Sequence, residues 1–83
     1  VCLAYARQQG VWALRLRPPP AGVPDALLVL VNGCVWWVEF KAPGGRLRPR
    51  QRLLLKQLEA AHQDCSVIDT RADFIEQLTR RLK

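Results

Sequence analysis

Two charged residues interrupt the apolar stretch "WWVEFK" in the middle of the chain. Glu39 and Lys41 are two positions apart, and alternate residues of a β-strand point to the same side of a sheet, so both side chains would reach the same volume. Asp25 is the only other acid among residues 1 to 58. Carboxylate oxygens can hold a divalent cation, and a lysine can stabilise charge on a phosphate. These residue types therefore suit metal-dependent hydrolysis of a phosphodiester.

The same residues have a plainer interpretation. Glu39 and Lys41 could form an ion pair at the end of a strand, while Asp25 could be a turn residue that follows a proline. Two acids and a lysine make a loose motif, so their spacing alone does not decide between the two interpretations.

The register of one hairpin does discriminate between them. Two apolar runs flank Asn32-Gly33, a strong signal for a β-hairpin. A two-residue turn would pair Asp25 with Phe40 and leave it on the opposite side of the sheet from Glu39. A three-residue loop, with Gly33 in the left-handed conformation, would place Asp25 directly opposite Glu39. We predict this second arrangement, because a shared site requires it.

Apolar periodicity predicts the elements that carry these side chains. We expect helices near residues 1–9, 48–62 and 70–83, and strands near residues 11–18, 25–31, 34–41 and 65–69. The order α-β-β-β-α-β-α predicts a small α/β domain with a mixed sheet of about four strands, whose last strand follows a right-handed crossover. Because the strands are apolar on both sides, we expect helices to cover both faces of the sheet.

Positive charge is concentrated in the first two thirds of the chain. The net charge is +6, and residues 1 to 58 contain nine Lys or Arg but only two acids. Most of the basic residues are Arg, whose planar fork suits phosphate. A polyanion, most simply nucleic acid, is the expected partner, and an inert solvated face is the alternative. The candidates for contacts with a nucleic-acid backbone are Arg15, Arg17, Arg46, Arg48, Arg50 and Arg52.

Composition argues against several other classes of protein. No apolar stretch approaches the roughly 20 residues of a membrane span, and the start does not resemble a signal peptide, so we expect an intracellular protein of the cytoplasm, nucleoid or nucleus that is not secreted. The three cysteines are scattered and include no CxxC pair, which favours neither disulfides nor zinc. His62 is expected at the surface rather than as a base. The tryptophans are expected to pack in the core; they are Trp12, Trp36 and Trp37.

The residues "GVPD", followed after thirteen residues by "EFK", resemble the signature of the PD-(D/E)XK nuclease superfamily. The continuation "EFKAPGGRLRPRQRLLLKQL" is similar to the VRR-NUC branch, in which the E-x-K strand leads through a Gly-rich turn into a helix with an early glutamine. The likeness covers residues 10 to 78 in element order. It implies a restriction-endonuclease-like fold and one nuclease domain over residues 1 to 83, without the start of its first helix.

The resemblance also implies roles for individual residues. Asp25 and Glu39 would bind Mg²⁺ or Mn²⁺, with the backbone carbonyl of Phe40 as a further ligand. Lys41 would orient the attacking water or stabilise the phosphate. Gln51 would lie near this site, and a simple polar role at the start of the helix is its alternative.

Further expectations follow from the same family. Its members tend to have a metal-site acid in their first helix; residues 1 to 10 contain none, so that acid would lie before Val1. The resemblance implies a homodimeric endonuclease that cuts branched DNA, such as a four-way junction, in DNA repair. Two alternatives stay open: the nuclease domain of a larger repair protein, and a catalytically idle module that binds nucleic acid.

Overall fold

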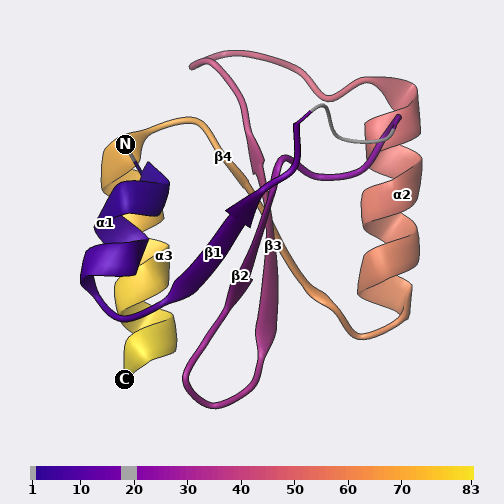
Figure 1. Cartoon of the computed structure of the whole chain (residues 1–83). Coiled ribbons are helices and arrows are strands. Elements are labelled where there is room, and N and C mark those ends of the chain that lie inside the picture. The colour runs from indigo at the N-terminus through magenta and orange to yellow at the C-terminus, as the bar shows by residue number, and fades with distance from the viewer. Residues whose placement is uncertain (1, 18–20) are drawn as a thin grey trace.

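The elements of the computed structural model follow the predicted order (Figure 1). The structure describes residues 2–17 and 21–83, so the first residue of the predicted first helix and the last residue of the predicted first strand lie outside the described residues. The elements are α1 (Cys2–Gln8), β1 (Trp12–Arg15), β2 (Ala26–Val29), β3 (Val35–Phe40), α2 (Pro49–Ala60), β4 (Asp64–Ile68) and α3 (Arg71–Leu82). The predicted small α/β fold is confirmed.

The four strands form one mixed sheet in the order β1-β2-β3-β4. The first three strands pair antiparallel, and β4 pairs parallel to β3 after the crossover through α2. The ends of β1 and β3 and the start of β2 therefore lie at one end of the sheet, which is the end where α2 begins (Figure 1).

The core lies between the sheet and the helices α1 and α3. Trp36 and Val38 of β3 are buried on this face, and the ring of Trp36 stacks on Phe74 of α3 with 5.5 Å between centroids. The helix α2 lies on the other side of the sheet, where it packs against β4 (Figure 1). The prediction that helices cover both faces is thus wrong for β1, whose Trp12 and Leu14 are exposed on the second face.

The orientation of β1 also differs from the prediction. Ala13 is buried, whereas Trp12 is 56% exposed, so the expectation of a core tryptophan is wrong at this position. The helix α1 packs closely on β1, and the guanidinium of Arg7 donates to the carbonyl of Ala13 at 2.7 Å. A small side chain permits this approach, and strand alternation then turns Trp12 outward. Trp36 is buried as predicted, and Trp37 is half-buried.

Helix ends follow local chemistry. The chain leaves α1 through Gly10, whose φ of +82° suits a left-handed cap. The hydroxyl of Thr70 accepts from the backbone N–H of Asp73 at 3.1 Å and caps α3. His62, just beyond α2, is exposed, as predicted. Within the described residues, no helix has the length and apolar character needed to span a bilayer.

Candidate metal-binding and catalytic site

The hairpin adopts the register that a shared site requires. The backbone N–H of Leu30 donates to the carbonyl of Cys34 at 2.9 Å, and Gly33 has a φ of +85°. The same pairing continues along β2 and β3 and brings Asp25 opposite Glu39. The predicted three-residue loop is confirmed, and the carboxyl group of Asp25 lies close enough to raise the pKa of Glu39.

The residue before Asp25 changes the hydrogen bonding at the end of β3. Continuing the register by one more residue places Pro24 opposite Phe40, in a position where antiparallel partners normally exchange two hydrogen bonds. Proline has no N–H to give to the carbonyl of Phe40. The N–H of Phe40 instead donates to Oδ2 of Asp25 at 2.9 Å. The Pro24-Asp25 pair therefore holds the Asp25 side chain in place and leaves the carbonyl of Phe40 without a hydrogen bond from the neighbouring strand. This role of Pro24 is apparent only once the register is known.

Glu39 is the buried acid of this site, with 3% of its surface exposed. Its Oε2 accepts from the amide of Gln51 at 3.3 Å and lies 3.5 Å from Nζ of Lys41. Burial, together with the negative charge of Asp25, raises the pKa of Glu39 from 4.5 to about 7, although the positive charge of Lys41 offsets part of this rise. An acid with a pKa near 7 is partly protonated at neutral pH and can give up its proton when a cation binds.

Gln51 links α2 to the strand. Its Oε1 accepts from the backbone N–H of Arg48 at 2.8 Å, while its amide nitrogen donates to Glu39. The structural interpretation of Gln51 holds, since its side chain caps the helix; the same side chain also contacts the buried acid, and its functional role stays a prediction. Gly22 allows this approach: a Cβ atom there would lie 2.8 Å from Cγ and 3.0 Å from the carbonyl oxygen of Arg50. The sequence showed this glycine without indicating the close contact.

The donor atoms suit a hard divalent cation. Asp25 and Glu39 offer carboxylate oxygens, and the carbonyl of Phe40 is an oxygen ligand of the same class. Burial and the neighbouring charge of Asp25 keep the pKa of Glu39 high, and a bound cation would lower it. In residues 2–17 and 21–83, no group of three or more His, Cys, Asp or Glu side chains could hold a metal. A cation here would therefore depend on two carboxylates, the backbone carbonyl and water.

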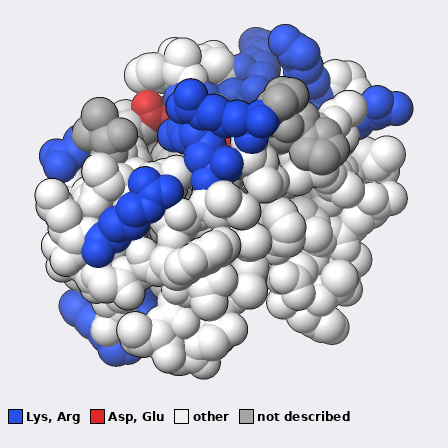
Figure 2. All heavy atoms as spheres, viewed as in Figure 1, with Lys and Arg blue, Asp and Glu red and all other residues white. Residues whose placement is uncertain are grey.

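Arginines lie on both sides of this end of the sheet. Arg15 ends β1, and its guanidinium lies 5.4 Å from the centroid of the Phe40 ring. The other predicted contact residues are exposed, and they are Arg17, Arg46, Arg48, Arg50 and Arg52. Figure 2 shows most of the visible Lys and Arg atoms in the upper half of the molecule, where β3 ends and α2 begins in Figure 1.

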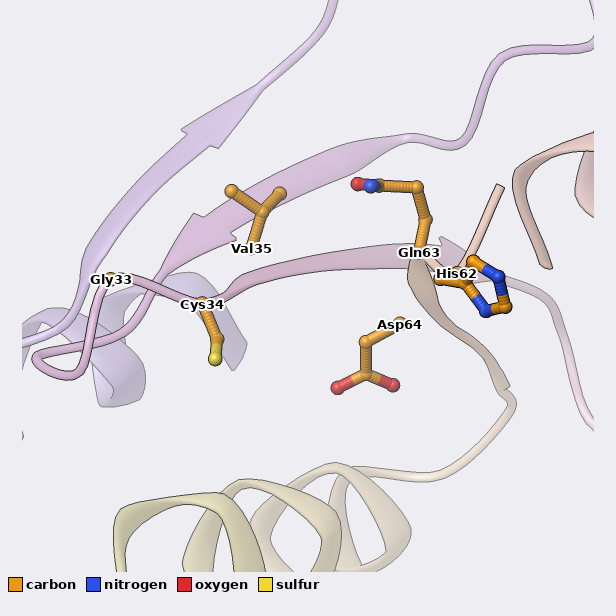
Figure 3. A pocket seen from close by; sticks show the side chains of 6 residues that line it. All are labelled: Gly33, Cys34, Val35, His62, Gln63 and Asp64. Carbon is orange, nitrogen blue, oxygen red and sulfur yellow. The ribbon is translucent and has the colours of Figure 1, made fainter. Parts of the chain in front are cut away.

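A separate hollow of about 310 Å³ lies at the opposite end of β3. Its lining includes Val35 and Gln63, which point to one side of the sheet, and Cys34 and Asp64, which point toward the other (Figure 3). Asp64 is held by a bidentate ion pair with Arg81 of α3. This hollow is remote from Glu39, and its one acid is already paired.

The chain is a small α/β domain with a mixed four-stranded sheet, and two carboxylates and a lysine lie together at one end of that sheet. No family model and no curated protein sequence matches the chain. A solved structure described as "VRR_NUC domain" has 20% sequence identity to it and a TM-score of 0.78, and the match covers 94% of this chain and 90% of that one. The chain has the fold of a VRR-NUC domain, and the resemblance inferred from its sequence is confirmed at the level of fold.

Proposed function

We propose that this protein is a metal-dependent endonuclease that hydrolyses phosphodiester bonds in DNA. The observation that carries the proposal is the convergence of Asp25 and Glu39 from neighbouring strands, with Lys41 and Gln51 both at Oε2 of Glu39. Two oxygen-bearing acids, a cation and a positioned amide are the parts that phosphodiester hydrolysis requires. The VRR-NUC fold supports the same activity.

Each residue of the site would have a separate role that follows from its position. Asp25, Glu39 and the carbonyl of Phe40 would hold Mg²⁺ or Mn²⁺, which when bound stabilises the charge that develops on the phosphate. Lys41 contacts Glu39 at 3.5 Å, and its remaining ammonium protons are positioned to hold the attacking water or a phosphate oxygen. Gln51 fixes the orientation of the Glu39 carboxylate through its hydrogen bond. Glu39 must be ionised to act as a ligand.

The finer part of the proposal concerns the substrate and the assembly. We propose that the substrate is branched DNA, with the four-way junction as its first candidate, and that the protein acts in DNA repair as a homodimer. Arginines on both sides of the site support a duplex backbone that crosses it. Two sites related by two-fold symmetry would suit paired cuts in a symmetric junction.

A cleavage assay with matched variants tests the activity. The wild-type protein should cut a four-way junction in Mg²⁺ or Mn²⁺ and should be inactive in EDTA. Asp25→Asn and Lys41→Met should each lower the rate by at least about a hundredfold, as expected for the loss of a charged catalytic group. Glu76→Gln, which changes an exposed acid on α3, should have no effect. Wild-type activity that persists in either site variant would exclude this mechanism.

A second candidate function is a nucleic-acid-binding module without catalysis. The observation that favours it is the presence of only two carboxylates at the site in the described residues. Calorimetry with Mn²⁺ separates the two functions: the nuclease should bind metal in a manner that Glu39→Gln abolishes. DNA binding that weakens with salt, without any metal binding, would instead identify the module.

A further inference from the structure

Two large apolar side chains lie exposed on β1, which is an edge strand of the sheet (Figure 1). Trp12 is 56% exposed and Leu14 is 42% exposed, and together they form the β1 strip. Their partners on β2, Val29 and Leu27, are half-buried. The exposed apolar surface is therefore a narrow strip along one strand, and its aromatic member is Trp12.

Strand pairing places the β1 strip on the same side of the sheet as the candidate site. Leu14 lies in one cross-strand row with Trp37, and Trp37 shares its side of β3 with Glu39. The backbone N–H of Leu16, two residues further along, donates to the carbonyl of Asp25 at 2.8 Å. The strip thus leads directly to the row that holds the two acids.

The distance along this path is short on the scale of a nucleic-acid strand. Trp12 precedes Leu16 by four residues, and four residues of β-strand extend about 13 Å. A DNA strand in a duplex advances about 3.4 Å per nucleotide, so about four nucleotides span this length. Fewer nucleotides are needed if the strand is extended. A strand with a phosphate at Asp25 and Glu39 can therefore bring a nearby base to Trp12.

A tryptophan ring in this position suits an unpaired base. In a duplex the flat faces of the bases are covered by their neighbours, whereas a base in a single-stranded segment can stack on an aromatic side chain. The charge around the strip favours a polyanion as its occupant. Arg15 and Arg17 follow the strip on the same segment of chain, and residues 1 to 58 contain no acid other than Asp25 and Glu39.

We propose that Trp12 is a specificity-determining residue that stacks on an unpaired base of the DNA strand held at the site. Its ligand is a single-stranded segment next to the scissile phosphate, such as unpaired bases beside a branch point. The location of the cut rests on the proposed nuclease function. The stacking contact itself requires no catalysis and can be measured without metal.

A comparison of two strands with the same phosphates tests the contact. Fluorescence anisotropy in EDTA measures the affinity for a labelled oligothymidylate of about 12 nucleotides and for an abasic strand of the same length. Trp12→Leu should bind oligothymidylate about tenfold more weakly than the wild type and should bind the abasic strand equally well, because only the first strand has bases to stack. Trp12→Phe is the matched control, since it keeps an aromatic face, and should retain most of the affinity. Trp12 is exposed, so both variants should fold.

Tryptophan fluorescence provides a second measurement. Trp12 is exposed whereas Trp36 is buried, so oligothymidylate should quench the emission of the wild type much more than that of Trp12→Leu. Equal quenching in the two proteins overturns the proposal. An unchanged affinity of Trp12→Leu for oligothymidylate also overturns it, as does an equal loss on both strands.

Sedimentation of the same proteins covers the alternative occupant of the strip. If Trp12→Leu alters self-association and leaves the affinity for oligothymidylate intact, the β1 strip is a protein contact and the proposal is wrong. Failure of this inference is distinguishable from failure of the nuclease assignment. A protein that shows base stacking at Trp12 but cleaves no DNA would contradict only the nuclease, and a nuclease whose affinity for single strands ignores Trp12 would contradict only this inference.

Discussion

The carboxyl group of Glu39 has almost no contact with solvent, and it shares its surroundings with the carboxyl group of Asp25. Burial and this neighbour disfavour the ionised form and hold the pKa of Glu39 at about 7 instead of 4.5. At neutral pH the site is thus poised between the protonated and ionised forms. Metal binding must displace the remaining proton, so metal affinity should rise with pH through this range.

The raised pKa of Glu39 should also make the stability of the metal-free protein depend on pH. Because the folded-state pKa of Glu39 lies above the unfolded value, its favourable contribution is complete below pH 4.5 and is lost as the pH rises through about 7. Urea unfolding in EDTA should therefore show the wild type losing roughly 2 to 3 kcal/mol between pH 5 and pH 8 relative to Glu39→Gln. Glu76→Gln, at an exposed position, should follow the wild type. Parallel pH profiles for the wild type and Glu39→Gln would contradict the shift.

Some of these residue-scale properties could be predicted from sequence and others could not. Glu39 and Lys41 share a side of β3 because of strand parity alone. Asn32-Gly33 indicated a hairpin but not its loop length, and the three-residue loop was predicted because a shared site requires Asp25 opposite Glu39. The effect of Pro24 on Phe40 depends on which backbone groups face each other, so it became visible only with the register. The pKa of Glu39 depends on burial, which the alternation of β3 does not specify.

The relation between elements was harder to predict than the elements themselves. Helix and strand order followed from apolar periodicity, because each element carries its own pattern. The orientation of β1 did not follow, since its apolar alternation favoured Trp12 over Ala13 as the inward residue. Packing against α1 selects the smaller side chain instead. Where a strand lies at the edge of a sheet and a helix crosses it closely, side-chain volume outweighs hydrophobicity.

The contact between the loop before β2 and the start of α2 should be sensitive to a single methyl group. Gly22 has a φ of +83°, and a Cβ atom there would overlap Arg50, including its backbone oxygen. Gly22→Ala should lower the free energy of unfolding by roughly 2 to 4 kcal/mol, from backbone strain plus overlap, and should reduce cleavage. Gly10→Ala is the matched control, with a φ of +82° and no atom within 4 Å. It should cost about 1 to 2 kcal/mol and leave cleavage intact.

Both substitutions introduce the same backbone strain, but only Gly22→Ala adds the overlap with Arg50, so the difference between the two variants reports the effect of the overlap. Urea unfolding measures that effect on stability, and the rate of metal-dependent cleavage measures it on activity. If Gly22→Ala and Gly10→Ala lose equal stability and retain equal activity, the contact between Gly22 and α2 does not position the site.

A polar cluster joins α3 to the sheet. The guanidinium of Arg81 lies 4.1 Å from the centroid of the Trp36 ring and donates to both carboxylate oxygens of Asp64 at 2.7 and 2.8 Å. Lysine cannot reproduce this planar, two-pronged contact. Arg81→Lys should lower the free energy of unfolding by about 1 to 3 kcal/mol, whereas Arg80→Lys, at an exposed position on α3, should change it by less than about 0.5 kcal/mol. If urea unfolding shows equal losses of stability for Arg81→Lys and Arg80→Lys, the two-pronged contact of Arg81 with Asp64 is not required for stability.

For the whole molecule, the arrangement of charge determines how DNA should bind. The net charge of +6 attracts any polyanion. If DNA responds only to this net charge, removal of any one arginine should change the affinity equally; if the phosphates follow a defined track of arginines, the effect should depend on which arginine is removed. Each phosphate contact releases counterions and contributes about 0.9 to the slope of log affinity against log salt concentration. A track formed by the predicted arginines would therefore make that slope depend on which arginine is removed.

Two substitutions with the same change in charge distinguish these cases. Arg46 lies in the loop between β3 and α2 on the side of the proposed site, and Arg80 lies on α3. Fluorescence anisotropy with junction DNA in EDTA, measured from 50 to 200 mM salt, should show a slope shallower by about 0.9 for Arg46→Gln and an unchanged slope for Arg80→Gln. Equal changes would mean that DNA responds to net charge alone. The expected difference would place the backbone beside Asp25 and Glu39, since the loop that carries Arg46 follows directly from the strand that carries Glu39.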